Sequence, residues 1–154
     1  MSKIVIISGY FNPVHVGHLD YMRAAKSLGD HLVVIINNDS QVELKGSVPF
    51  MGESERLDIV SSIKYVNQAV LSVDSGRSVI ETLKMLHGRY SVDPFVDSVT
   101  FANGGDRDEG NSPEEEFCQQ VGIRTVYGVG GEKTQSSSSL LRNAGMEGQG
   151  DSVV

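Results

Sequence analysis

Near its amino terminus the chain carries the sequence IVIISGYFNPVHVGH, residues 4–18. The first four residues are all apolar and β-branched, which is typical of a strand buried on both faces. A turn with glycine and proline follows, and residues 16–28 then place Leu19 and Met22 on one side at helical spacing. A buried strand that leads directly into a helix predicts the opening unit of a parallel α/β sheet.

The same alternation of strand-like and helix-like segments continues along the chain. Strands are expected at residues 4–7, 32–36, 69–73, 96–102 and 123–127, and helices at residues 16–28, 53–65 and 78–87 and from residue 112 onward. Residues 37–52 are predicted to form one long loop. The last of these helices has a predicted capping box, in which Ser112 caps, Pro113 takes the first helical position and Glu115 returns the bond.

These elements predict an α/β fold. The expected architecture is a single-domain, doubly wound, five-stranded parallel sheet of Rossmann-like type with helices on both faces. The domain is expected at residues 1–144, and the glycine-rich, polar residues 145–154 are expected to form a disordered tail. Ligands of such sheets bind at the carboxyl ends of the strands, near the switch in strand order.

Composition argues against several classes of protein. The chain has 154 residues with 13 basic and 20 acidic side chains, a net charge of −7, which disfavours nucleic acid as the main partner because such binding needs a basic face. No apolar run approaches the roughly 20 residues that span a bilayer, and the first apolar run is too short for a signal peptide, so no membrane partner is expected. The single cysteine, Cys118, makes no internal disulfide and favours a reducing, cytoplasmic setting.

The strongest functional signal is a pair of histidines. His15 and His18 are three residues apart at the expected start of a helix, so they share one face, and Gly17 between them leaves room for a ligand. A helix start offers N–H groups and partial positive charge to phosphate, and two imidazoles there can donate further hydrogen bonds. The alternative is a zinc pair, but the zincin spacing of four residues with an adjacent glutamate is missing and no third ligand is evident. The pattern therefore indicates a phosphate site, and no metal ligand is predicted.

A second phosphate-binding segment is expected after the last strand. Lys133 and Thr134 precede a run of four serines, residues 136–139, which leads into the apolar Leu140 and Leu141. Successive hydroxyls and N–H groups at such a helix start can hold the β- and γ-phosphates of a nucleotide. A flexible serine-rich linker is the alternative interpretation, and the flanking residues favour the helix.

Together these residues resemble the HxGH nucleotidyltransferase superfamily, and the likeness covers nearly the whole chain. Residues 18–30, 55–60 and 63–66 look like the corresponding segments of its cytidylyltransferase branch. Glycerol-3-phosphate cytidylyltransferases and heptose-phosphate adenylyltransferases are the most similar by pattern. Residues 133–142 resemble the second signature of the superfamily, a Ser/Thr triplet that opens a helix.

The resemblance implies transfer of a nucleoside monophosphate from a triphosphate to a phosphomonoester, such as glycerol 3-phosphate or a related alcohol or sugar phosphate, with release of pyrophosphate. It implies His15, His18 and Lys45 as catalytic residues, with Lys45 bridging the acceptor phosphate and the α-phosphate. The residues implied to bind the nucleotide are Gly9, Tyr10, Phe11, Gly17, Lys64, Gly105, Asp106, Lys133, Thr134, Ser137, Ser138 and Ser139. Mg²⁺ is expected with the triphosphate, held mostly by phosphate oxygens and water. Relatives of this kind are often dimers, so a homodimer is one expectation.

The choice of triphosphate stays open between two readings. CTP is favoured because residues 18–30 and 63–66 follow the cytidylyltransferase branch. ATP, with a sugar phosphate or mononucleotide acceptor, is the alternative, because Asn12 replaces the usual Asp and the FNPVH stretch resembles nicotinamide-mononucleotide adenylyltransferases. Tyr10 also departs from the usual Thr or Ser, and Lys133 from the frequent Arg. A non-catalytic nucleotide-binding module on the same fold is the alternative from a different class.

Overall fold

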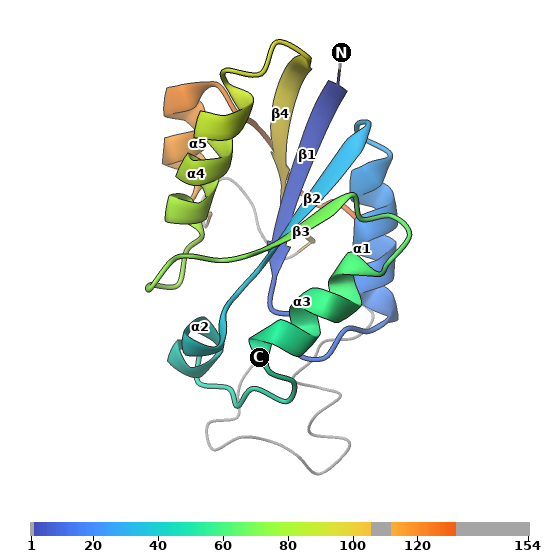
Figure 1. The fold of residues 1–154 in the computed structure, drawn as a ribbon, viewed down its shortest axis with the longest axis vertical. Coiled ribbons are helices and arrows are strands. Elements are labelled where there is room, and N and C mark those ends of the chain that lie inside the picture. Colours follow the sequence, from blue (N-terminus) through green and yellow to red (C-terminus); the bar gives the residue numbers. More distant parts are fainter. Residues whose placement is uncertain (1, 106–111, 132–154) are drawn as a thin grey trace.

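The amino-terminal run of β-branched residues forms the central strand of the sheet. The structure is a computed structural model and describes residues 2–105 and 112–131. Strand β1 (Ser2–Gly9) pairs in parallel with β2 (His31–Ile36) on one side and with β4 (Val96–Ala102) on the other. Strands β3 (Gln68–Leu71) and β5 (Arg124–Val126) complete a five-stranded, all-parallel sheet of order β3-β2-β1-β4-β5 (Figure 1).

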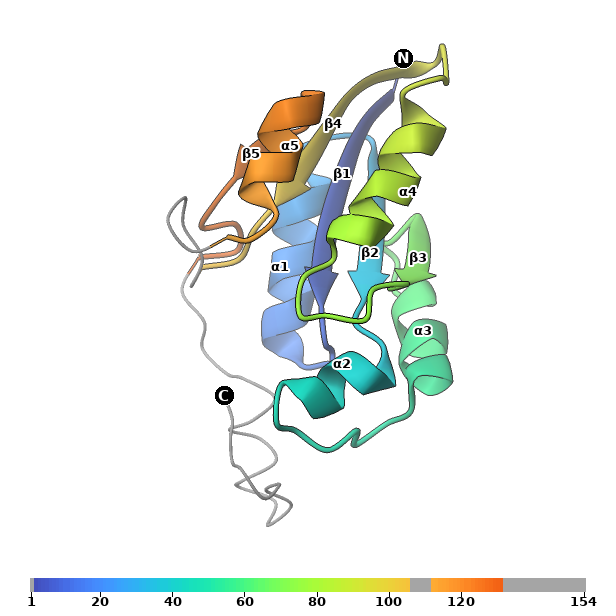
Figure 2. The same cartoon turned by 90° about the vertical axis from the view of Figure 1, so that its left-hand side faces the viewer.

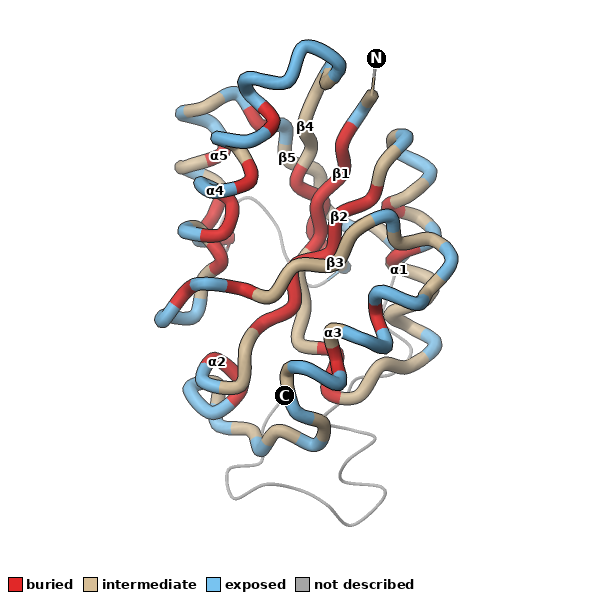
Figure 3. The backbone as a smooth tube through the Cα atoms, in the orientation of Figure 1, coloured by how far each residue is buried: buried red, intermediate tan, exposed pale blue. Residues whose placement is uncertain are grey.

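Helices cover both faces of this sheet. One face packs against α4 (Ile80–Tyr90) and α5 (Glu115–Val121), and the other against α1 (Val16–Lys26) and α3 (Glu53–Ser61) (Figure 2). The alternation of strand side chains divides the core in two, and Figure 3 shows the central strands as the most buried part of the chain. Ile4, Ile6, Val33 and Ile35 belong to the first cluster, and Val5, Ile7, Leu32 and Val34 to the second. The prediction of a doubly wound α/β fold is confirmed.

The strand order places the switch point at β1. The chain leaves β1 through α1 toward β2, whereas the later β4 is added on the opposite side. The segments that follow β1 and β4 therefore separate at the carboxyl edge of the sheet, which is where ligands of doubly wound folds bind. This edge also carries the segment after β2.

The segment after β2 differs from its prediction as a loop. Residues Asp39–Leu44 form a short helix, α2, which is capped by Asn38 Oδ1 accepting from Gln41 N–H at 2.9 Å. Its sequence, DSQVEL, is mostly polar and has almost no hydrophobic periodicity, which is why the sequence did not predict a helix there. It ends at the C-cap Lys45, which therefore stands at a helix end and not in an unstructured loop.

The predicted capping box before α5 is wrong. The N-cap residue is Glu114, which makes no side-chain cap, and the helix begins at Glu115. Glu114 is 1% exposed, and its Oε2 accepts the backbone N–H of Val79 at 3.0 Å, while Ser112 Oγ donates to its Oε1 at 3.4 Å. Ser112 and Glu114 thus hold the start of α4 from another part of the chain, a contact that local sequence cannot reveal.

No helix in residues 2–105 and 112–131 combines the length and the apolar character that crossing a bilayer requires. The predicted tail at 145–154 lies outside the described residues.

Cys118 is a packed core residue. It is 0% exposed in the cluster under α4 and α5, and this burial, with smaller contributions from Glu114 and Glu115, raises the pKa of its thiol to about 12. We expect no reaction of the native chain with a thiol reagent at about pH 8, because only a thiolate attacks, and full reaction after unfolding in urea. Rapid labelling of the native chain would contradict this burial.

The same pKa shift predicts the sign of a pH effect on stability. In the unfolded chain the thiol ionises near its ordinary value of 9.0, but in the folded chain it stays protonated until about pH 12. Its contribution to the free energy of unfolding is therefore complete below that ordinary value and is lost as the pH rises from there.

Candidate active site

Two histidines cap the start of α1 reciprocally. His15 is the N-cap residue, and its Nδ1 accepts a hydrogen bond from Gly17 N–H at 3.1 Å. The backbone N–H of His15 in turn donates to Nδ1 of His18, also at 3.1 Å. The two rings stack with centroids 3.8 Å apart and an interplanar angle of 25°. The backbone thus fixes both imidazoles as one unit at the end of the helix.

These caps also decide which nitrogen carries the proton. Because Nδ1 of each ring accepts a backbone N–H, the proton of the neutral ring is assigned to Nε2. Nε2–H is then the group that each ring can donate to a ligand. Both side chains are partly exposed. Two such donors side by side at a helix start suit the oxygens of a polyphosphate.

The turn between β1 and α1 supports this pair. Phe11 is 1% exposed, has a left-handed φ of 53°, and packs its ring edge-on against His18 with centroids 4.8 Å apart. Gly9 makes room for that ring, since a Cβ on Gly9 would lie 2.7 Å from Phe11 Cζ. Phe11 and Gly9 thus support the ring of His18, and their predicted contacts with a nucleotide stay predictions.

Charge distinguishes α1 from the other helix starts. Among the helices that the structure describes, α1 alone has no acidic residue in its first turn. The start of α4 is filled by the chain itself, because Asp74 accepts N–H bonds from Glu81 at 2.7 Å and from Thr82 at 3.0 Å. A carboxylate there satisfies the same N–H groups that a phosphate would use. The first turn of α1 thus carries no carboxylate that would repel an anionic ligand.

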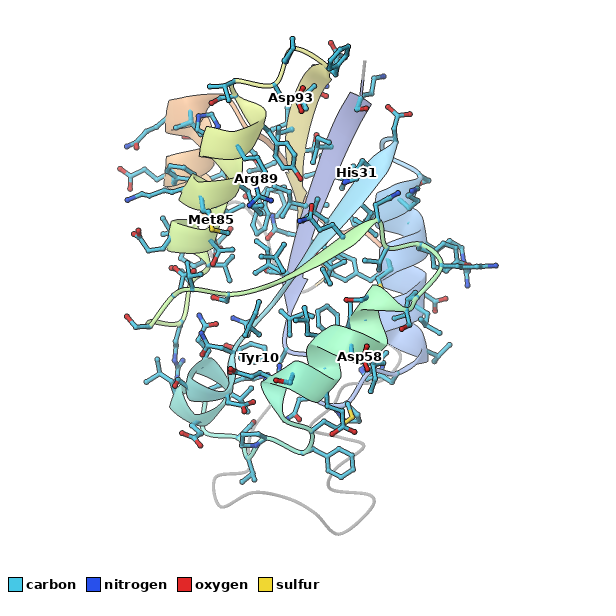
Figure 4. All side chains as sticks on the ribbon, viewed as in Figure 1. Tyr10, His31, Asp58, Met85, Arg89 and Asp93 are labelled. Atoms are coloured by element: carbon cyan, nitrogen blue, oxygen red, sulfur yellow. The ribbon has the colours of Figure 1, made fainter. Side chains whose placement is uncertain are left out.

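Lys45 lies on the ring of Tyr10. The Lys45 Nζ is 4.2 Å from the Tyr10 ring centroid, a cation–π contact between the end of α2 and the turn that carries the histidines. Figure 4 shows Tyr10 between α2 and α3 at the carboxyl edge of the sheet. The structure therefore joins the predicted catalytic lysine to the segment after β1, although 35 positions of sequence separate Lys45 from Tyr10.

Arg56 is a site residue to which sequence reasoning gave no role. Its side chain is fully buried and donates from Nη1 to the carbonyls of Tyr10 at 2.8 Å and Asn37 at 2.6 Å. Nη2 bonds Asp39 Oδ1 at 2.7 Å, and Nε bonds the Met51 carbonyl at 2.9 Å. One guanidinium thus ties the segments after β1 and β2 to the start of α3. A usable signal was its spacing of four from the buried Val60, which puts both on the inner face of α3.

A family model described as cytidylyltransferase-like matches residues 6–102. The chain belongs to this family. A FAD synthase of Thermoplasma acidophilum is 40% identical over 81 residues, which cover 51% of this chain and 57% of that protein. The bifunctional protein HldE of Citrifermentans bemidjiense is 39% identical over 112 residues, which cover 68% of this chain and 23% of that protein. The chain thus matches just over half of one relative and under a quarter of the other.

A comparison with a solved structure agrees with this family assignment. The lipopolysaccharide core biosynthesis protein of Thermoplasma volcanium superposes with a TM-score of 0.65 at 25% identity, over 86% of this chain and 100% of that one. Together with the matched family model, this places the chain in a family of nucleotidyltransferases.

Lys64 is the predicted site residue that the structure leaves apart from the histidines of this cytidylyltransferase-like domain. Its Nζ lies 5.2 Å from the ring centroid of Tyr65, whose hydroxyl accepts from Arg23 Nε at 3.1 Å. That bond lowers the pKa of the Tyr65 phenol. Arg23 is in the last turn of α1, eight residues or about 12 Å of helix from His15. A nucleotide contact of Lys64 stays a prediction.

Other predicted residues lie at the edge of the described part of the chain. Gly105 is exposed in the turn after β4, at the carboxyl edge of the sheet. The predicted residues outside the described ranges are Asp106, Lys133, Thr134, Ser137, Ser138 and Ser139. Their contacts with a nucleotide stay predictions.

Proposed function

We propose that the protein is an adenylyltransferase, which transfers AMP from ATP to a phosphomonoester acceptor and releases pyrophosphate. The observation that carries this proposal is the pair of Nε2–H donors of His15 and His18 at a helix start without first-turn acid. They suit the phosphates of a nucleotide, and Lys45 on the ring of Tyr10 supplies a positive charge at the turn that leads to the histidines.

The relatives favour ATP over the CTP that sequence patterns suggested. FAD is flavin mononucleotide joined to AMP, so the relative that is named a FAD synthase makes a product with an adenylyl half. The relative HldE agrees with the sequence resemblance to heptose-phosphate adenylyltransferases, which also use ATP. The alternative of adenylyl transfer therefore has better support than transfer from CTP.

The reaction in this proposal needs no covalent enzyme intermediate. An oxygen of the acceptor phosphate attacks the α-phosphorus of ATP, the new P–O bond forms, and the bond from that phosphorus to the bridging oxygen breaks. The electron pair leaves with pyrophosphate. His15 and His18 stabilise the charge that develops on the α- and β-phosphate oxygens, and Lys45 brings together two anions that repel each other. In the proposal Lys133 and Ser137–Ser139 hold the leaving pyrophosphate.

Mg²⁺ enters this proposal with the triphosphate. Within residues 2–105 and 112–131 no group of three or more His, Cys, Asp or Glu side chains is placed to hold a metal ion. In the proposal the magnesium ion is held by phosphate oxygens and water, which is its usual mode with nucleotides. Its part would be to screen the charge of the triphosphate.

A matrix of substrates tests the proposal. Pyrophosphate release is measured for ATP, CTP, GTP and UTP, each with flavin mononucleotide, glycerol 3-phosphate and hexose and heptose phosphates. We expect release with ATP and one class of acceptor, and none without acceptor. Release with CTP alone would contradict the choice of adenylyl transfer. If no pair reacts although a triphosphate binds, the protein is a non-catalytic nucleotide-binding module.

A further inference from the structure

Asn12, in the turn between β1 and α1, is a buried polar residue whose partners lie far along the chain. It is 4% exposed. Its Nδ2 donates to the Val48 carbonyl at 2.9 Å, and its Oδ1 accepts the N–H groups of Phe50 at 2.7 Å and Met51 at 3.2 Å. Both halves of the amide are therefore used by the backbone of one segment.

The anchored segment follows directly after Lys45. Upstream, Lys45 is held by the end of α2, where its N–H donates to the Gln41 carbonyl at 3.0 Å. Downstream, Gly46 turns the chain with a φ of 94°, and the bonds of Asn12 begin at Val48. Three residues span at most about 11 Å, so an anchor at Val48 limits where Lys45 can stand.

The turn between β1 and α1 is linked to residues 45–51 in two other ways, one direct and one through Arg56. The ring of Tyr10 lies under Lys45 Nζ at 4.2 Å. The Tyr10 carbonyl accepts from Arg56, which also bonds the Met51 carbonyl. The turn that leads to the histidines and the segment that carries Lys45 are thus held together as one unit.

We propose that Asn12 is a positioning residue for the acceptor side of the site, which holds residues 48–51 so that Lys45 faces the histidine pair. This inference rests on the proposed function, in which Lys45 meets the acceptor phosphate. Asn12 itself is buried and acts through the segment that it anchors.

An amide fits this position where a carboxylate does not. An aspartate could still accept from Phe50 and Met51, but it has no N–H to donate to the Val48 carbonyl and would set a negative oxygen against it. Asn12 stands where the cytidylyltransferase pattern carries Asp, so the bond to the Val48 carbonyl is one that the residue of that pattern could not donate.

Three variants and two readouts test this role. Asn12→Leu removes both halves of the amide, and Asn12→Asp removes only the donor. Asn67→Leu is the matched control, because Asn67 also accepts a backbone N–H from a distant segment, that of Leu32 at 2.8 Å, but does not touch residues 45–51. The readouts are KM for acceptor and for triphosphate separately, and deuterium uptake of the Phe50 and Met51 amides.

For Asn12→Leu we expect the acceptor KM to rise about tenfold and uptake at Phe50 and Met51 to accelerate about tenfold. The triphosphate KM should rise clearly less, because Lys45 also meets the α-phosphate in the proposal, but His15 and His18 hold the triphosphate as well. Asn12→Asp keeps the side-chain oxygen that accepts the N–H groups of Phe50 and Met51, so the KM for the acceptor substrate should rise less than in Asn12→Leu. This variant serves as the test if Asn12→Leu does not fold. Asn67→Leu should change neither constant.

Several results would overturn the inference. An equal rise of both KM values would show a general loss of structure, and faster uptake with an unchanged acceptor KM would show an anchor without influence on Lys45. Unchanged deuterium uptake at Phe50 and Met51 in Asn12→Leu would show that Asn12 does not hold this segment. A wild-type chain that turns over no substrate pair would instead overturn the proposed function, and this role of Asn12 with it.

Discussion

Replacing His18 by alanine should lower turnover by about 10²-fold or more while the fold stays intact. The ring of His18 accepts the backbone N–H of His15, stacks on the His15 ring at 3.8 Å and packs against Phe11. Its loss removes one donor to the developing charge and releases the other ring from its stack. The measurement is single-turnover release of pyrophosphate at saturating triphosphate, together with circular dichroism to confirm the fold.

The matched control is His31→Ala. His31 lies at the start of β2 (Figure 4), whereas the histidine pair follows the carboxyl end of the parallel strand β1, and burial lowers the pKa of the His31 imidazole. We expect turnover of this variant within about twofold of wild type, because the residue touches no part of the site. Undiminished turnover of His18→Ala would remove the histidine pair from the mechanism.

The strand–turn–helix at the start of the chain could be predicted because its signals are local. Four β-branched residues, a turn and a helical period lie next to one another, and the reciprocal caps of His15 and His18 span only three positions. The apolar runs gave all five strands to within a few residues, since each strand is buried by its own side chains.

The parts that could not be predicted depend on contacts between distant segments. Helix α2 has only Val42 and Gln41 buried, so its stability comes from bonds such as that of Gln41 Nε2 to the carbonyl of Gly76 at 2.7 Å. The partners of Asn12 lie 36 to 39 positions away. Hydrophobic patterns carry no information about such polar contacts.

A fully buried arginine is the clearest example. Arginine is almost never fully buried unless it is paired, and the sequence around Arg56 does not indicate the partners that pair it. The structure supplies four acceptors, and those on Tyr10, Asn37 and Asp39 come from segments that become neighbours only in the folded chain. This one side chain therefore links the turn after β1, the segment after β2 and the start of α3.

Arg56→Met should therefore lower the free energy of unfolding by about 3 kcal/mol or more. The methionine fills similar space but donates nothing, so the carbonyls of Tyr10, Asn37 and Met51 lose a donor and Asp39 loses its ion pair of 2.7 Å. The measurement is urea-induced unfolding, followed by far-ultraviolet circular dichroism because the chain has no tryptophan.

Arg23→Met is the matched control for this loss. Arg23 pairs with Asp20 at 3.5 Å, but the side chains are 60% and 45% exposed, and such solvent-screened pairs contribute little to stability. We expect its unfolding midpoint near that of wild type and that of Arg56→Met well below it. Equal midpoints for the two variants would mean that water replaces the buried guanidinium at little cost. The turn of His15 and the segment of Lys45 would then be held mainly by Asn12, and turnover of Arg56→Met would stay close to wild type.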